Sequence, residues 1–279
     1  MIFWIASYPK SGNTWVRSFL SAYYFSQDGK FNFDLLKNIK QFPSKEFFNK
    51  KIENIEDAAE NWLIPQREIK IKNKSCFLKT HNVYGSYRGK PFTTNEFTAG
   101  AIIIVRDPRN VITSLMNHYS INEDSALKMI SSIHRNLRDI NNEEDYSNYS
   151  FISSWSNNYN SWKSAKNINK ILIKYEELEN NTDKIFSDII NFINSITKKK
   201  GIINKEKFKN SIRSTSFDIL RKKEREDGFD EAVYSDEEGK KKTFFNLGRE
   251  NNYKILLKKK TINSIEKLFS KEMEELGYL

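Results

Sequence analysis

SYPKSGNTW, residues 7–15, joins a strand-like run to a helix-like run. Residues 1–6, MIFWIA, precede it and are almost all apolar, which is typical of a buried strand. Residues 16–25, VRSFLSAYYF, follow it and are typical of an amphipathic helix, which we expect over 14–25. The backbone N–H groups and the positive dipole end at a helix N-terminus bind anions. The stretch therefore predicts an anion site between the first strand and the first helix.

This anion loop differs from the common nucleotide-binding loop. The pattern G-x-x-x-x-G-K-[ST] places its lysine directly before Ser or Thr. Here Lys10 precedes Ser11 and Gly12, and the first glycine of the pattern is missing. An ordinary strand–turn–helix with a solvent-exposed lysine is the structural alternative. Pro9 stiffens the exit from the strand and Gly12 permits a tight turn, so the combination favours an anion site.

Length and composition indicate one folded domain of residues 1–279. The chain has 279 residues, 38% of them hydrophobic, which is enough for one large α/β core. No run of about 18 apolar residues predicts a transmembrane helix. MIFWIA is too short for a signal sequence and lacks a basic start, so we expect no cleaved leader. The single cysteine, Cys76, rules out an internal disulfide and favours the cytoplasm.

The formal net charge of +10 suggests an anionic partner: nucleic acid, a membrane surface or a polyanionic small ligand. The basic runs at residues 198–200, 240–242 and 258–260 are scattered, which favours ordinary solvated faces. No zinc-finger spacing or RNA-binding signature appears, so we expect no nucleic-acid partner.

Four apolar runs predict strands at Ile2–Ala6, Cys76–Lys79, Ala101–Val105 and Ile171–Lys174. The third run, AIIIV, is uninterrupted and β-branched, as in a central parallel strand. Helix-like stretches lie between the runs. This alternation favours an α/β fold with a mainly parallel sheet and helices on both faces.

Beyond residues 14–25, a second helix is expected from Asp107 to Tyr119, where Pro108 stands at a harmless first-turn position. Apolar residues recur at helical spacing in three more stretches: Leu127, Ile130, Ile133 and Leu137; Ile185, Ile189, Ile193 and Ile196 after the expected N-cap Thr182; Ile262, Ile265, Phe269 and Leu276. Residues 28–72 are expected to be irregular and residues 226–247 to form a long loop. Both segments are expected to shape a ligand pocket or a lid.

Polar residues stand at the ends of two predicted strands, where parallel sheets bind ligands. Lys79, Thr80 and His81 end the second strand, and a histidine there can act as a general base. An isolated histidine is more often structural, but the adjacent lysine and the anion loop favour catalysis. His118 and His134 are expected to be structural or to line a pocket.

Arg106 and Asp107 follow the third strand. A magnesium-binding role for Asp107 is an alternative, but Arg106 separates it from the apolar run. Arg106 and Ser114, two turns into the next helix, can both bind a phosphate. Tyr175 ends the fourth strand and can line a purine pocket or the core. Thr215 and Phe217 can contact a base or start a helix.

Together these stretches resemble the sulfotransferases that use 3′-phosphoadenosine 5′-phosphosulfate (PAPS). The chain is identified as a member of that family, similar to bacterial members of the cytosolic type. The resemblance runs through SYPKSGNTW (7–15), KTH (79–81), RDPRNVITS (106–114), YEEL (175–178), TSF (215–217) and FFNLGRENNY (244–253). It spans nearly the whole chain, and its first and third stretches are specific as a pair.

The resemblance implies a three-layer α/β fold related to P-loop kinases, with PAPS as cosubstrate, 3′-phosphoadenosine 5′-phosphate (PAP) as product, and no metal. The residues implied for the 5′-phosphosulfate are Lys10, Ser11, Gly12, Asn13, Thr14 and Trp15, of which Trp15 also reaches the adenine. Arg106 and Ser114 are implied for the 3′-phosphate, and Tyr175, Thr215 and Phe217 for the adenine. His81 is implied as the base, with Lys10 and Lys79 stabilising the charge of the transferring group.

The last stretch departs from the family pattern F-F-R-x-G-x-x-G-x-W. Asn246 takes the place of the arginine, Asn251 that of the second glycine and Tyr253 that of the tryptophan. Gly248 is kept, and Arg249 follows it. Either Arg249 supplies the missing cation or the 3′-phosphate is held more weakly.

Two alternatives remain beside a sulfotransferase acting on a hydroxyl or amine of a small molecule, lipid or sugar. One is a P-loop nucleotide or small-molecule kinase, which magnesium dependence separates. The other is a non-enzymatic module that binds polyanions, with steep salt dependence. Thr261, Ile262 and Glu266 resemble part of a dimerisation motif, but Leu257 stands where it has lysine. A homodimer and a solvated terminal helix both fit these residues.

Overall fold

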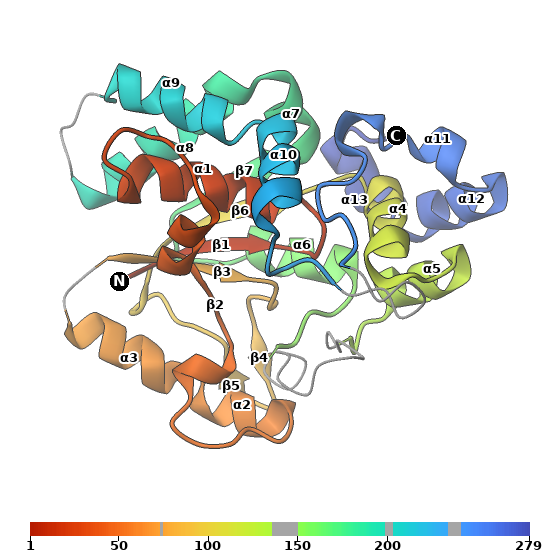
Figure 1. Cartoon of the computed structure of the whole chain (residues 1–279). Helices are drawn as coiled ribbons and strands as arrows, with labels where there is room; N and C mark the ends of the chain where they lie inside the picture. Colours follow the sequence, from red (N-terminus) through yellow and green to blue (C-terminus); the bar gives the residue numbers. More distant parts are fainter. Residues whose placement is uncertain (73–74, 136–149, 199–202, 234–240) are drawn as a thin grey trace.

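A five-stranded parallel sheet in the order β2-β3-β1-β6-β7 forms the centre of the chain (Figure 1). The structure is a computed structural model that describes residues 1–72, 75–135, 150–198, 203–233 and 241–279. The strands of this sheet are β1 (Ile2–Ser7), β2 (Lys40–Gln41), β3 (Cys76–Thr80), β6 (Thr98–Val105) and β7 (Lys170–Lys174). A separate antiparallel pair joins β4 (Ser86–Tyr87) to β5 (Lys90–Pro91).

β1 is the central strand, and all six of its residues are buried. Its side chains alternate between two cores: Phe3 and Ile5 face one, and Ile2, Trp4 and Ala6 face the other. A strand covered on both faces has no solvent side, which explains why the sequence is an unbroken apolar run.

The core around Phe3 is covered by α1 (Asn13–Phe25), α8 (Thr182–Thr197) and α9 (Lys205–Ser214). Phe19 of α1 stacks on Phe186 of α8 with ring centroids 3.8 Å apart. The buried isoleucines of α8 recur at helical spacing and form the apolar stripe that packs against the sheet.

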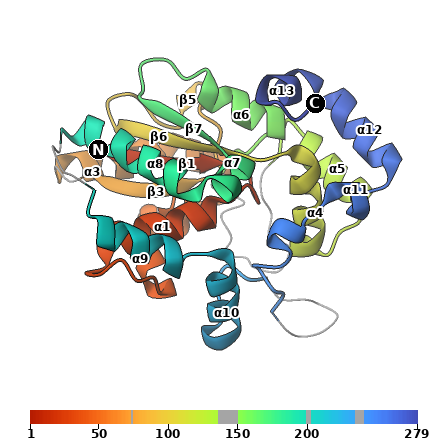
Figure 2. The same cartoon turned by 90° about the horizontal axis from the view of Figure 1, so that it is seen from above.

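The opposite core lies under α2 (Ile55–Asn61), α3 (Leu63–Ile71) and α6 (Trp155–Lys163). Trp4 of β1 contacts Phe92 and Trp162 there, with ring centroids 5.1 Å and 6.4 Å away. Figure 2 shows α1 and α9 on one side of the sheet and α6 on the other. The sheet and its two helix layers form the three-layer α/β architecture that the resemblance implied.

A third group of helices stands at one end of the sheet in both views (Figures 1 and 2). It consists of α4 (Pro108–Tyr119), α5 (Glu123–Ser131), α11 (Tyr253–Leu256), α12 (Lys259–Leu268) and α13 (Ser270–Leu276). α4 starts directly after β6, with Pro108 in its first turn and Asp107 as N-cap, accepting from the N–H of Arg109 at 2.9 Å.

Two further α-helices are α7 (Tyr175–Asn180), directly after β7, and α10 (Phe217–Asp227), and a 3-10 helix, η4, covers Gly248–Glu250. α10 packs with the returning segment 241–247 in a cluster that includes Leu220, Phe229 and Phe245. None of the helices in the described ranges has the length and apolar character needed to span a bilayer.

The four predicted strands and the helices at 14–25 and 107–119 are confirmed within one residue at each end, except that β6 begins at Thr98, three residues before the predicted Ala101. The expectation that residues 28–72 are irregular was wrong, because they contain the 3-10 helices η1 (Phe33–Asn38) and η2 (Lys45–Phe47) as well as β2, α2 and α3. The expected terminal helix is two helices, broken at Phe269. Thr182 is the first residue of α8 and its N-cap is Asn181. Ile133 lies past the end of α5, and Leu137 falls outside the described residues.

Candidate active site

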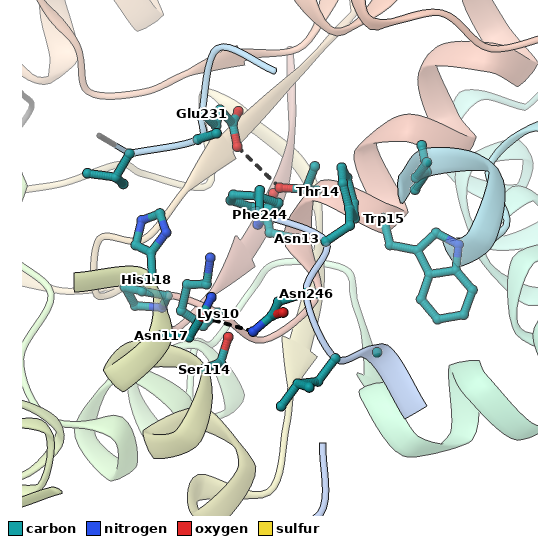
Figure 3. A pocket seen from close by; sticks show the side chains of 18 of the residues that line it. Lys10, Asn13, Thr14, Trp15, Ser114, Asn117, His118, Glu231, Phe244 and Asn246 are labelled. Carbon is teal, nitrogen blue, oxygen red and sulfur yellow. Dashed lines mark hydrogen bonds between the residues drawn. The ribbon is translucent and has the colours of Figure 1, made fainter. Parts of the chain in front are cut away.

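A cavity of about 690 Å³ opens where β1, β3, β6 and β7 end. β1 pairs with β3 on one side and β6 on the other, so the cavity lies where the connections diverge, the usual ligand site of such sheets. Twelve of the predicted site residues line it: Lys10, Gly12, Asn13, Thr14, Trp15, Lys79, His81, Arg106, Ser114, Tyr175, Phe217 and Gly248. Figure 3 shows several of them around the cavity.

The anion loop has the backbone conformation that its sequence suggests. Lys10 and Gly12 both have positive φ angles, 66° and 98°, which turn backbone N–H groups outward. A Cβ on Gly12 would lie 2.5 Å from the ring of Tyr175, so only glycine fits here. The side-chain amide of Asn13 donates to the carbonyl of Ile5 at 2.9 Å and fixes the loop to β1.

Four buried polar atoms of the loop and of Arg106 beside it have no hydrogen-bond partner among the described residues. They are the donors Ser11 Oγ, Trp15 Nε1 and Arg106 Nε and the acceptor Asn13 Oδ1. Buried donors are usually paired, so a ligand with several acceptor oxygens fits this part of the cavity. Ser11 itself is buried behind the cavity wall rather than on it.

Lys10 extends into the cavity and lies over the ring of Phe244, with Nζ 3.8 Å from the ring centroid. Burial lowers the pKa of Lys10 to about 7, opposed by the nearby carboxylate of Glu231. Its charge therefore depends on the anions around it, including a bound ligand.

His81 is buried at the end of β3, and its Nδ1 lies 2.8 Å from the carbonyl oxygen of Ser7. A carbonyl can only accept, so Nδ1 carries the proton and Nε2 keeps its lone pair. Burial, reinforced by the charge of Lys79, lowers the pKa of His81 to about 3. The imidazole is therefore neutral near pH 7, as a general base must be.

Glu231 enters the same space from the segment 228–233 (Figure 3). Its carboxylate accepts from Thr14 Oγ1 at 3.2 Å and from Lys79 Nζ at 3.3 Å, and it pairs with Arg17. Burial acts to raise the pKa of this carboxyl, but Lys79 and Arg17 outweigh it and hold the pKa well below its usual range. Glu231 is thus an anion inside a cluster of cations.

Arg106 lines the same cavity. Its Nη1 donates to the carbonyl of Lys10 at 3.1 Å, and its guanidinium lies 4.1 Å from the ring centroid of Tyr175. Ser114 lines the cavity from α4, one turn before Asn117. The side-chain amide of Asn246 donates to that of Asn117 at 2.8 Å (Figure 3).

Asp107 is held in an ion pair with Arg109, which donates to both of its carboxylate oxygens at distances from 2.7 to 3.2 Å. Arg109 also bonds Glu266 and the carbonyl of Tyr278. This pairing gives Asp107 a structural role and does not favour the magnesium alternative. Thr261, from the motif-like stretch near the C-terminus, pairs with Glu123 of the same chain.

The late segment contributes Gly248 but not Arg249. Gly248 has a φ of 52°, and a Cβ there would lie 2.6 Å from the ring of Phe217. Arg249 is exposed and donates to the carbonyl of Glu179 at 2.8 Å, away from the cavity lining. Thr215 is fully buried and donates to the carbonyl of Ser211 at 2.7 Å. The structure therefore does not bring Ser11, Thr215 or Arg249 to the cavity wall.

Comparison with known proteins gives the family. The model of the sulfotransferase domain matches residues 2–277. The chain belongs to the sulfotransferase family. This sulfotransferase is similar to the crystal structure of mouse sulfotransferase SULT7A1 complexed with PAP, at 19% identity and a TM-score of 0.60, covering 98% of this chain and 84% of that one.

It is also similar to retinol dehydratase in complex with androsterone and inactive cofactor PAP, at 13% identity and a TM-score of 0.61 over 98% of this chain and 80% of that one. Both likenesses concern the fold. No curated protein sequence matches the chain significantly.

Sequence analysis of this sulfotransferase missed Glu231 and left His118 undecided. His118 lines the cavity beside Phe244, and burial lowers its pKa to about 2 with help from Lys10 and Lys79. Glu231 lies in the polar stretch 226–247 among several other acids, and its partner Arg17 is 214 residues away. No local pattern distinguishes it from the solvated acids beside it.

Proposed function

We propose that this protein transfers the sulfuryl group of PAPS to a hydroxyl or amine of a small acceptor. The observation that carries the proposal is one cavity that contains both an anion loop and a neutral histidine with a free Nε2. Membership of the sulfotransferase family supports the reaction class. The PAP named in both structural relatives supports the donor.

We assign residues of the cavity to the parts of the donor by matching charges, hydrogen-bond donors and aromatic rings. The loop amides, Lys10 and Thr14 bind the 5′-phosphosulfate, and Arg106 with Ser114 binds the 3′-phosphate. The rings of Trp15, Tyr175 and Phe217 enclose the adenine. At the late segment, Asn246 offers an amide donor where the family pattern has arginine, so a full charge is missing from that wall.

In the transfer step, Nε2 of His81 takes the proton of the acceptor as it attacks sulfur. Lys10 and Lys79 neutralise the charge that grows on the leaving phosphate and on the sulfuryl oxygens. Positioning and charge stabilisation carry most of the catalysis of phosphoryl transfer, and sulfuryl transfer is chemically close to it. No step of this scheme calls for a metal.

The acceptor shares the 690 Å³ cavity with the nucleotide, which favours a small molecule or one exposed hydroxyl of a lipid or sugar. We place the protein in the cytoplasm, because its single cysteine, Cys76, is free.

Calorimetric titration tests the proposal. The full chain is titrated with PAP, and separately with ATP and magnesium. We expect micromolar binding of PAP and little binding of ATP. A preference for ATP with magnesium, or no binding of PAP, would refute the assignment of the donor. Adenosine 5′-phosphosulfate serves as the control ligand without a 3′-phosphate.

A further inference from the structure

The carboxylate of Glu231 occupies the part of the site that the proposed function assigns to the transferring group. Its Oε2 accepts from Lys79 Nζ at 3.3 Å and from Thr14 Oγ1 at 3.2 Å. Lys79 belongs to β3, which His81 directly follows, and Thr14 belongs to the first turn of α1, which the anion loop leads into. A sulfonate is, like a carboxylate, an anion that accepts from the same donors.

We infer that Glu231 is an internal anion that competes with the terminal sulfonate of the donor for Lys79 and Thr14. The inference rests on the proposed function and deepens it. Two negative groups held by the same two donors repel each other strongly at contact distance, since little water separates them. Donor binding therefore has to displace the carboxylate from these two contacts.

Arg17 can keep its ion pair with the carboxylate of Glu231 after that carboxylate has left Lys79 and Thr14. Its side chain is buried in α1, and it does not line the cavity. It pairs with the second carboxylate oxygen of Glu231 and also donates to the carbonyl of Ile39 at 2.9 Å. Glu231 can thus release both cavity-facing contacts and still neutralise a buried cation, which would be costly to leave unpaired.

The segment that carries Glu231 is anchored on both sides. The ring of Phe229 lies 4.7 Å from that of Phe33 and 4.9 Å from that of Phe244, centroid to centroid. The carbonyl of Val233 accepts from the N–H of Lys242 at 2.8 Å. With the backbone anchored, a turn of the Glu231 side chain, which is 29% exposed, suffices for the exchange.

The competition discriminates between donor and product. PAP lacks the sulfonate, so the carboxylate can stay on Lys79 and Thr14 while PAP is bound. A ligand that carries the sulfonate must first displace it. The ratio of the affinity for PAP to the affinity for a donor analogue should therefore be higher in the wild-type chain than in a variant that lacks the charge of Glu231.

Calorimetry with two ligands tests the inference. One ligand is PAP, and the other is a PAPS analogue in which methylene replaces the oxygen between phosphorus and sulfur, so that no transfer occurs. We expect Glu231→Gln to bind the analogue roughly tenfold more tightly, or more, and to change PAP affinity little. Asp227→Asn is the control, because it removes a negative charge from an exposed residue nearby in the chain that does not line the cavity.

An unchanged ratio of the two affinities in Glu231→Gln would overturn the inference, and so would equal tightening for both ligands. If the single variant fails to fold because Arg17 loses its counterion, the double variant Arg17→Met/Glu231→Gln removes the pair together and gives the same readout. Failure of the wild-type chain to bind PAP would refute the proposed function itself. Binding of PAP without a change of ratio would refute only the role of Glu231.

Discussion

At the scale of single residues, the site depends on groups whose charges are set by burial. His81 is neutral because it is buried beside Lys79, and its tautomer is fixed by the carbonyl of Ser7. Lys10 is buried among both signs of charge, and its pKa is lowered to about 7. Perturbed groups that share one cavity are typical of catalytic sites.

Replacing the proposed base separates chemistry from binding. His81→Ala should lower turnover by roughly 10²- to 10⁴-fold, as loss of a general base usually does. PAP affinity, measured by calorimetry, should stay near the wild-type value because His81 does not contact the nucleotide in our assignment. His134→Ala is the control, since His134 is exposed and outside the cavity lining. Turnover within a few-fold of wild type would assign the base to another group.

The affinity for PAP should depend on pH through Lys10. Its lowered pKa of about 7 means that the free protein loses this positive charge as pH rises through 7. A bound anion favours the protonated form, so PAP should bind best below pH 7 and weaken by up to about tenfold per unit above it. Calorimetry between pH 6 and 9 measures this. Lys10→Arg, which keeps its charge, should remove the dependence; the same slope in that variant would point to a different group.

At the scale of elements, the site is a set of strand ends and the turns that follow them. β1, β6 and α4 could be predicted because a buried parallel strand is a continuous apolar run and because Pro108 marks a helix start. The polar residues at those strand ends were therefore found in the sequence. β2 could not be, because it is two residues long and polar, Lys40 and Gln41, and its position comes from pairing with β3.

Helices α2 and α3 were missed for a related reason. They have seven and nine residues, too few for a clear helical period, although Asn54 caps α2 by accepting from the N–H groups of Glu56 and Asp57. Glu231 could not be predicted because its role depends on its contacts with Arg17, Lys79 and Thr14. These residues are distant in sequence, and only the fold brings them to Glu231.

The anion loop should not tolerate a methyl group at Gly12. Gly12→Ala adds a Cβ at a φ of 98° and 2.5 Å from Tyr175, so the loop must shift. We expect loss of PAP binding by calorimetry and a decrease of more than about 1 kcal/mol in the free energy of unfolding. Gly85→Ala is the control, because its φ is not positive and a Cβ there meets nothing within 4 Å. Normal PAP affinity in Gly12→Ala would contradict the described loop.

At the scale of the whole molecule, Arg109 joins the C-terminal helices to the start of α4, directly after the interior strand β6. Its guanidinium pairs with Asp107 after β6 and with Glu266 of α12, and it bonds the carbonyl of Tyr278. It also lies 4.1 Å from the ring centroid of Tyr253. One buried side chain thus connects the start of α4 to three places in the C-terminal part of the chain, at Tyr253, Glu266 and Tyr278.

Removing Arg109 should destabilise the whole chain. Arg109→Ala leaves Asp107 buried without its partner, and breaking such a pair typically costs about 3–5 kcal/mol. Urea unfolding measures the loss, and Arg109→Lys should recover part of it by restoring the charge without the fork geometry. A decrease below about 1 kcal/mol in Arg109→Ala would show that the network adds little.

The central position of β1 also has a consequence for how the chain is made. Phe3 pairs with Phe77, and Ile5 pairs with Ile102, so β1 leaves the ribosome before its partners, which follow some 74 to 97 residues later. Until then IFWIAS is an uncharged, β-prone segment with two open edges, the kind that nucleates aggregation. Expression at low temperature, or together with a chaperone that binds this segment, should therefore raise the yield of folded protein. Substitutions on the solvent-exposed faces of the helices should not change that yield.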